Sequence, residues 1–356
     1  AIRIDNVGGG GAVDNSVYYM SGLRHDARYR TNVGFLNPTT VPIAATVTVY
    51  DSAKFKIGEF QLSLQPFQLD PFQLKSRVPN LPDDEPFSVK IDVTTPNAWI
   101  VGYASYLDGL SNDPVYIEAI PESEMASPDY KTTILPGVGH VGQWRSDVTI
   151  FNPDADGVMF DLTYYNAAGE KIAETPNVPL DGGKFVQYSD IIKQGVLPNV
   201  GDGLGTLKVT VKDNHEKYPM TFARTYFDNG ANGTFGQGIP SFSPARPNVK
   251  PGQHAIIAGV RNSATYRTNI GLVNVGTTAV TATVTLLDPI TGAAVSAVPY
   301  TLQPNQTIVG NYNGWNGLSQ GTFKIEANGP VWAFCSVIDT QTNDPEYVKA
   351  QPVVTP

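Results

Sequence analysis

The stretch YRTNVGFLN at residues 29–37 returns as WRSDVTIFN at residues 144–152 and as YRTNIGLVN at residues 266–274. Each stretch is followed later by an Asp-x-x-x-Asn segment, at residues 108–112, 228–232 and 339–343. The copies begin roughly 120 residues apart, a period too long for a solenoid unit and typical of a small domain. We therefore interpret the 356 residues as three copies of one domain.

Each copy consists of short segments in which apolar and polar residues alternate, separated by Gly, Pro, Asn and Asp. Residues 46–51 (TVTVYD) and 283–288 (TVTLLD) are matching examples, with Thr predicted on the outer face and Val or Leu on the inner face. Amphipathic runs long enough for a substantial helix are missing from the sequence. The pattern predicts an all-β protein made of three tandem antiparallel Ig-like β-sandwich domains.

The phase of the repeat predicts the domain boundaries. We expect β-sandwiches over residues 17–121, 132–240 and 253–352, after an N-terminal extension over residues 1–16. Proline-rich segments follow the first and second sandwiches. Because proline fixes φ and removes a backbone donor, we expect stiff linkers and a preferred arrangement of the three domains.

The N-terminal extension reads as a strand on a leash. Ile2 and Ile4 alternate with polar residues, and four glycines follow from Gly8 to Gly11. Such a strand can pair with its own sheet or with the open edge of a neighbouring molecule. Ile2 and Ile4 are therefore the candidate assembly residues, and pairing within the chain is the alternative.

Composition and charge exclude several classes of protein. The formal net charge is −9 and no Lys- or Arg-rich block occurs, so a nucleic-acid-binding footprint is missing. The apolar run at residues 99–107 is far shorter than the ~20 residues that a membrane-spanning helix needs, and we expect no membrane insertion. The single cysteine, Cys335, excludes an internal disulfide and is interpreted as a core residue. The start at Ala1 without methionine favours an exported protein with its signal peptide removed, located outside the cell or on its surface, and trimming of an expressed chain is the alternative.

Charged residues recur at fixed places in the three copies. An arginine stands in the second strand of each copy, and an aspartate ends the seventh strand. Because a guanidinium can bond a carboxylate through two parallel hydrogen bonds, we predict a structural ion pair in each domain. The predicted pairs are Arg30 with Asp108, Arg145 with Asp228 and Arg267 with Asp339.

The hairpin after each aspartate is rich in turn-forming residues. It reads Asn-Asp-Pro at residues 112–114 and 343–345, and Asn-Gly-Thr at residues 232–234. Asn, Asp, Gly and Pro are typical of tight turns. A calcium site is the alternative, since calcium binds oxygen ligands. Its candidate ligands are Asp108, Asn112, Asp113, Asp339, Asn343 and Asp344. We expect no other cofactor.

A catalytic site is not apparent in the sequence. The four histidines lack a metal-binding or nucleophile–base spacing. The GxGxxG match at residues 137–142 precedes a strand and not a helix, so it is interpreted as a loop. Trp315 lies in a polar segment, NYNGWNG, where packing over the end of the sandwich is the favoured interpretation, and stacking on a sugar ring or a protein partner is the alternative. We expect no enzyme.

The pairing of YRTNVGFLN or YRTNIGLVN with a later strand such as residues 337–345 (VIDTQTNDP) resembles tandem Ig-like modules of exported bacterial proteins, which are often present in several copies and have no assigned activity. The middle copy departs from the pattern at Arg224 and at residues 233–236. The resemblance implies an extracellular β-sandwich and transfers no catalytic residue.

Together these features favour an extracellular structural or adhesive protein at the cell surface, such as a self-assembling subunit of a surface or filamentous structure. Its expected partners are further copies of itself or other surface proteins. The alternative function is carbohydrate binding through exposed aromatic residues, and an enzyme or inhibitor comes third.

Overall fold

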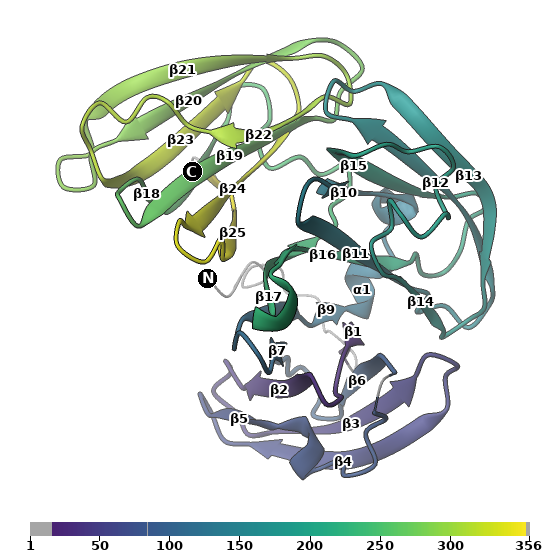
Figure 1. Ribbon diagram of the computed structural model, residues 1–356. Coiled ribbons are helices and arrows are strands. Elements are labelled where there is room, and N and C mark those ends of the chain that lie inside the picture. The colour runs from purple at the N-terminus through teal and green to yellow at the C-terminus, as the bar shows by residue number, and fades with distance from the viewer. Residues whose placement is uncertain (1–15, 84, 354–356) are drawn as a thin grey trace.

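The computed structural model describes residues 16–83 and 85–353, and nearly all regular structure in this part of the chain is β-strand. Six antiparallel sheets form three two-layered sandwiches, one for each copy of the repeated motif (Figure 1). The predicted all-β fold with tandem sandwiches is confirmed. Ile2 and Ile4, the candidate assembly residues, lie outside the described residues.

The first repeat has a five-stranded and a four-stranded sheet. The larger sheet has the spatial order β4 (Lys56–Leu64), β3 (Ile43–Asp51), β6 (Phe87–Val93), β1 (Val17–Leu23) and β9 (Ile120–Pro121). The smaller sheet has the order β5 (Leu69–Gln73), β2 (Tyr29–Leu36), β7 (Val101–Asp108) and β8 (Pro114–Glu118), and the short helix η1 (Leu74–Ser76) follows β5.

The second and third repeats keep this order. In the second repeat, the counterpart of the larger sheet has the order β13 (Lys171–Leu180), β12 (Val158–Asn166), β15 (Gly203–Val211) and β10 (Thr132–His140). The counterpart of the smaller sheet has the order β14 (Phe185–Tyr188), β11 (Trp144–Phe151), β16 (Met220–Asp228) and β17 (Thr234–Pro240). In the third repeat, the larger sheet has the order β21 (Ala294–Leu302), β20 (Val280–Leu287), β23 (Gln320–Ala327), β18 (His254–Arg261) and β26 (Gln351–Val353). Its smaller sheet has the order β22 (Thr307–Asn311), β19 (Tyr266–Asn274), β24 (Val331–Asp339) and β25 (Pro345–Lys349). Short helices lie between strands: α1 (Glu122–Met125), η2 (Pro128–Lys131) and η3 (Gly230–Asn232).

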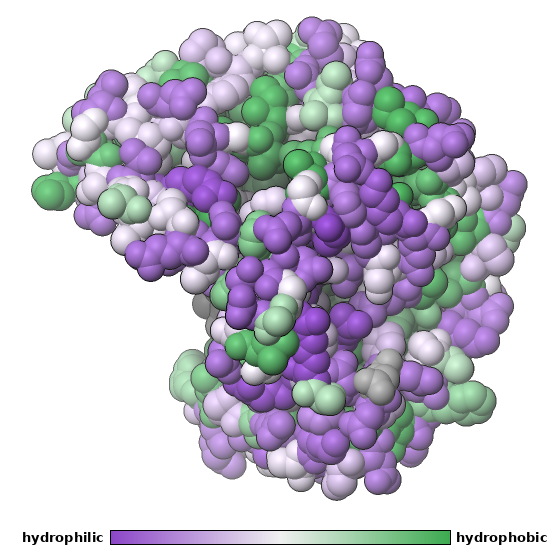
Figure 2. Space-filling model, in the orientation of Figure 1, coloured by the Kyte–Doolittle hydropathy of each residue, from purple (hydrophilic) through white to green (hydrophobic). Residues whose placement is uncertain are grey.

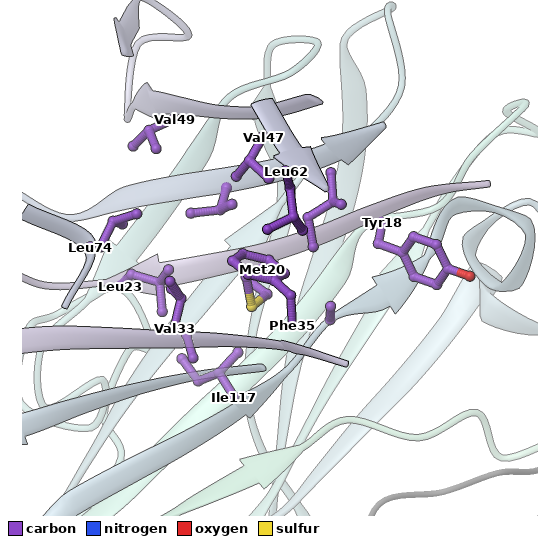
Figure 3. Packing of buried hydrophobic residues seen from close by; sticks show 14 of the residues in the cluster. Tyr18, Met20, Leu23, Val33, Phe35, Val47, Val49, Leu62, Leu74 and Ile117 are labelled. Carbon is purple, nitrogen blue, oxygen red and sulfur yellow. The ribbon is translucent and has the colours of Figure 1, made fainter. Parts of the chain in front are cut away.

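The core of each sandwich follows from the alternation of the strands. In the first repeat, Met20 and Val47 of the larger sheet pack against Val33 and Phe35 of the smaller sheet (Figure 3). All four side chains are buried. Because successive residues of a strand point to opposite faces, the period-two pattern places one apolar row of each sheet in the interior.

The last residue of the repeated motif fastens each sandwich. The Asn37 amide donates to the carbonyls of Val41, Leu64 and Gln65, at 2.8, 3.2 and 3.0 Å. Asn152 and Asn274 make corresponding bonds, and all three asparagines are fully buried. A buried amide with several backbone partners holds loops in one geometry, which accounts for its place in every copy.

The three sandwiches form an open arc, with the first and third repeats at its ends (Figure 1). Two apolar interfaces hold the arc together. Between the first and second repeats, the cluster contains Tyr19, Met125, Phe151, Phe185 and Met220. Between the second and third repeats, it contains Ile134, Phe242, Val273, Trp332 and Phe334. The rings of Phe242 and Trp332 stack at 4.0 Å between centroids.

Candidate functional site: a charged junction between the three repeats

The predicted arginine–aspartate pairs do not form among the described residues. In the pairing of β2 with β7, Tyr29 and not Arg30 stands opposite Asp108. Adjacent residues of a strand point to opposite faces, so Arg30 points away from the carboxylate. It donates instead to Asn112 Oδ1, at 3.1 Å.

The other two arginines also have different partners. Arg267 donates to Asn343 Oδ1 at 3.5 Å, the counterpart of the contact made by Arg30. Arg145 donates to the carbonyls of Gly142 and Trp144. The repeated aspartates open the hairpins: Asp108, Asp228 and Asp339 each accept a hydrogen bond from the backbone N–H two residues later. The repeated residues thus serve turns, as the turn interpretation expected.

The hairpins of the three repeats meet inside the arc. Strand β8 of the first repeat contacts β17 of the second repeat, and β17 also contacts β25 of the third repeat. Ser111 donates to the carbonyl of Thr234 at 2.6 Å. Gly233 leaves room for this approach, because a Cβ there would lie 2.8 Å from the backbone nitrogen of Ser111.

Asp108 is the first carboxylate of this junction, and it is fully buried. Its Oδ2 accepts hydrogen bonds from Arg28 Nη2 at 2.9 Å and from the N–H and hydroxyl of Thr234 at 2.9 and 2.7 Å. Burial alone would raise the pKa of Asp108. The hydrogen bonds from Arg28 and Thr234 outweigh burial and lower that pKa to about 2. Asp108 is therefore charged at neutral pH and joins the first repeat to the second.

Arg224 lies at the centre of the junction and is 2% exposed. Its Nη2 donates to Thr234 Oγ1 at 2.7 Å and to Asp113 Oδ2 at 3.3 Å. The guanidinium carbon lies 4.6 Å from the ring centroid of Tyr226 and 5.9 Å from those of Tyr29 and Tyr106. Nε and Nη1 have no hydrogen-bond partner among the described residues. Aromatic faces and carboxylates thus hold a cation that burial disfavours.

Asp113 and Asp344 bring the first and third repeats together. Their carboxyl groups are hydrogen-bonded to each other, and Asp113 also accepts from the N–H of Gly236 at 2.8 Å. Burial, followed by the negative charge of Asp344, raises the pKa of Asp113 to about 7, against the opposing charge of Arg224. Burial raises the pKa of Asp344 as well. A carboxyl–carboxyl hydrogen bond needs a proton, so the pair is held best when one group is protonated.

A polar depression of about 390 Å³ opens beside the junction, between the first and second repeats. Arg24, Arg28, Asp147 and Tyr226 are among its lining residues. Arg24 lies 3.9 Å from Asp147, whose Oδ1 accepts from the hydroxyl of Tyr226 at 3.3 Å. Burial raises the pKa of Asp147. The depression is therefore lined by charges that already pair with one another.

The six candidate calcium ligands occupy two of the hairpins. Asn112 and Asn343 hold φ values of 61° and 63°, which asparagine tolerates in tight turns. The oxygens of Asn112 and Asn343 accept from arginines, and those of Asp113 and Asp344 face each other. No group of three or more His, Cys, Asp or Glu side chains in residues 16–83 and 85–353 is placed to hold a metal ion. Arg224 beside Asp113 also opposes a cation there.

Trp315 does not present its ring to solvent. It is 7% exposed and packs against Tyr312 and Phe323, each at 5.9 Å between centroids. The packing interpretation is therefore the observed arrangement. An edge of Trp315 lines a depression of about 320 Å³ with Arg267 and several asparagines.

The sequence reasoning missed Arg28, Asp113 and Arg224 as partners across domains. Arg28 stands just before the repeated motif and has no counterpart in the other copies. Arg224 was visible as a departure of the middle copy, and departures from a repeat mark the places where the copies have different surroundings.

Comparisons with known proteins identify no relative of this chain. No protein-family model and no curated protein matches it. Among solved structures, β-glucuronidase of Bacteroides uniformis is 10% identical over 65% of this chain and 26% of that chain, with a TM-score of 0.15. A human norovirus GI.7 virus-like particle subunit is 10% identical over 99% of this chain and 92% of that chain, with a TM-score of 0.19. The chain spans about a quarter of the length of the β-glucuronidase. No helix in the described ranges combines the length and apolar character required to traverse a bilayer.

Proposed function

We propose that this chain is a non-enzymatic structural protein of the cell surface or an extracellular assembly, which holds three sandwiches in a fixed arc. The observation that supports this most is the double connection between repeats. Apolar interfaces join consecutive repeats, and the charged junction joins all three. Domains connected only by linkers move relative to one another by default, so such contacts favour a role that requires rigidity.

The chemistry of the charged residues supports the same proposal. Arg224 of the second repeat donates to Asp113 of the first repeat. Asp108 and Asp113 of the first repeat accept from backbone N–H groups of the second repeat. The hydrogen bonds that these side chains make thus hold the first and second repeats together. The resemblance of the repeated motif to Ig-like modules of exported bacterial proteins supports an extracellular location.

Immunogold electron microscopy of the producing cells tests the location and the role. Antibodies against the purified chain are expected to label the cell surface or an external filament in a regular array. Label confined to the cytoplasm, or spread through the medium without order, would overturn the proposal. A strain lacking the gene provides the control for antibody specificity.

Carbohydrate binding is the second candidate, and the depression beside Trp315 favours it. Asn262, Asn311, Asn313, Asn316 and Arg267 line this depression and supply amide and guanidinium groups that can bond sugar hydroxyls. A glycan array with the full chain tests it. A signal lost in Arg267→Ala but kept in Arg30→Ala would support binding at this depression, and an array without signal would reject it.

A further inference from the structure

The two apolar interfaces are copies of each other. In the first repeat, Tyr19 of β1 stands opposite Lys90, and in the second repeat Ile134 of β10 stands opposite Lys208. Both side chains are buried by the smaller sheet of the following repeat. In that smaller sheet, the residues that contact them occupy equivalent positions. Phe151 pairs with Met220 and Phe185 in the second repeat, and Val273 pairs with Trp332 and Thr307 in the third.

A second contact between consecutive repeats is also copied. The hairpin between β3 and β4 reaches the turn between β13 and β14, where Lys54 Nζ donates to the carbonyl of Gly182 at 3.2 Å. The hairpin between β12 and β13 reaches the turn between β21 and β22, where Thr307 donates to the carbonyl of Ala167 at 3.2 Å. Each repeat therefore offers the first strand of its larger sheet and one hairpin, and the next repeat accepts both with its smaller sheet and one turn.

In the described structure, no other repeat covers the accepting face of the first repeat. Leu36 is the equivalent of Phe151 and Val273, and Leu69, the equivalent of Phe185, is 48% exposed. Tyr103 and Tyr116 stack as Phe334 and Tyr347 do, with ring centroids 5.7 Å apart in the first repeat and 5.1 Å in the third. Tyr116 is 46% exposed, whereas the stack in the third repeat packs against Ile134 and Trp332.

The accepting turn of the first repeat carries an exposed aromatic residue. Phe67 stands at the left-handed position of this turn, with φ of 59°, where the second and third repeats have Gly183 and Asn305. A left-handed φ is strained for an aromatic residue, and the side chain is 66% exposed. Folding of the isolated chain gives no reason for a strained, exposed phenylalanine, whereas a contact with another molecule does.

In the described structure, no other repeat covers the corresponding offering face of the third repeat. Ile256 of β18 stands opposite Lys324, as Tyr19 and Ile134 stand opposite Lys90 and Lys208. The hairpin between β20 and β21 projects at the left tip of the arc (Figure 1), where Figure 2 shows a small apolar spot among polar residues. Ile290 in this hairpin is 91% exposed.

We propose that the third repeat of one molecule docks on the smaller sheet of the first repeat of a second copy, through the contact that already joins consecutive repeats within the chain. This inference deepens the proposed structural role by naming its partner and its surface. The contact is head-to-tail, so it generates a filament when the rotation between molecules does not close. Leu69 and Tyr116 on the accepting face and Ile290 on the offering hairpin are exposed, so both sides are accessible.

The contact between molecules is weaker than the contacts inside the chain. Gln351 stands opposite Ile256, where the internal interfaces have Ile120 opposite Tyr19 and Phe242 beside Ile134. A polar residue there buries less apolar surface, so association depends on concentration while the arc itself remains intact.

Analytical ultracentrifugation of the full chain over a range of concentrations tests the proposal. The wild-type chain is expected to form species that grow with concentration. Phe67→Asp blocks the accepting face and Ile290→Asp blocks the offering face, and both changes fall on exposed turns. Each variant alone is expected to stay monomeric, with association weakened at least about tenfold, the change that corresponds to 1.4 kcal/mol. An equimolar mixture of the two is expected to form a 1:1 dimer and nothing larger, because one intact pair of faces remains.

Val141→Asp, at an exposed turn of the middle repeat, is the matched control and is expected to associate like the wild type. A wild-type chain that stays monomeric up to millimolar concentration overturns the docking. Association that survives in both variants, or that disappears only when residues 1–11 are deleted, assigns assembly to another surface and also overturns it. Immunogold labelling tests the structural role separately, so failure of the docking and failure of that role are distinguishable.

Discussion

The middle repeat and the two outer repeats differ at the point where all three meet. In the smaller sheet of the outer repeats, Asn32 pairs with Ser105 and Asn269 pairs with Ser336. At the same position the middle repeat pairs Asp147 with Arg224. The hairpins differ as well: the outer repeats have Asp-Pro, and the middle repeat has Gly-Thr at residues 233–234.

These differences show how identical units can share one centre. The outer hairpins supply the carboxylates Asp108, Asp113 and Asp344. The middle repeat supplies a cation, a hydroxyl and backbone N–H groups, and it lacks the aspartate that would add another negative charge. Three identical hairpins would repel one another there, so the repeat has to be broken for the arc to form.

Exchanging the residue of the middle repeat for that of the outer repeats is expected to have the largest effect. Arg224→Ser removes a buried cation and leaves Asp113 without its charge partner. Breaking a buried pair in this way costs about 3–5 kcal/mol. Urea unfolding of the full chain at pH 8 measures the change in the unfolding midpoint.

Ser336→Ala is the matched control for Arg224→Ser, because Ser336 is buried at the equivalent position of the third repeat. It is expected to change stability by less than about 1 kcal/mol. Equal effects of the two variants would show that the junction contributes nothing beyond ordinary packing.

The pH dependence of stability follows from the Asp113–Asp344 pair. The pKa of Asp113 is about 7 in the folded chain, and its ordinary value, expected in the unfolded chain, is 3.8. The folded state therefore binds more protons than the unfolded state between these values, and stability falls as pH rises from about 4 to 7.

Asp344→Asn separates this effect from the rest of the titration. Asparagine keeps the hydrogen bond to Asp113 without the charge, so the decline in stability between pH 4 and 7 is expected to become shallower. Unfolding midpoints at several pH values measure the slope. An unchanged slope in Asp344→Asn would mean that the two carboxyl groups do not interact.

Asp108 is expected to act in the opposite direction and at lower pH. Its folded pKa of about 2 lies below the usual 3.8, so its contribution is complete above pH 4 and is lost as pH falls through 2. Asp108→Asn is expected to cost roughly 2 kcal/mol at pH 7 and little at pH 2. Asp339→Asn, which alters the equivalent residue in the hairpin of the third repeat, is expected to cost less than about 1 kcal/mol. Thermal unfolding of both variants at these pH values makes the comparison.

The features that recur in all three copies predicted the fold, whereas several residues that form the junction between the repeats do not recur. Alternation and the thrice-repeated motif were sufficient for the β-sandwiches, because each strand pattern acts within its own domain. The contacts of Asp113 with Gly236 and of Asp108 with Thr234 join residues more than a hundred positions apart in different repeats. Their distances depend on how whole domains pack, which local patterns do not encode. The polar segment around Trp315 likewise left packing and ligand stacking both open, and the structure shows the ring packed on Phe323.

The smallest expected effect comes from a comparison of two arginines. The sequence predicted Arg30 as the partner of Asp108, and the structure pairs Asp108 with Arg28. Arg30 donates one hydrogen bond to Asn112 on the surface, so Arg30→Ala is expected to change stability by no more than about 0.5 kcal/mol. Arg28 donates two hydrogen bonds to buried Asp108, and Arg28→Ala is expected to cost about 1–2 kcal/mol, reduced by its partial exposure. Thermal melts of the two variants at pH 7 give the difference directly. A larger effect from Arg30→Ala than from Arg28→Ala would contradict this expectation. It would support the predicted ion pair between Arg30 and Asp108, in which each repeat is stabilised by its own residues.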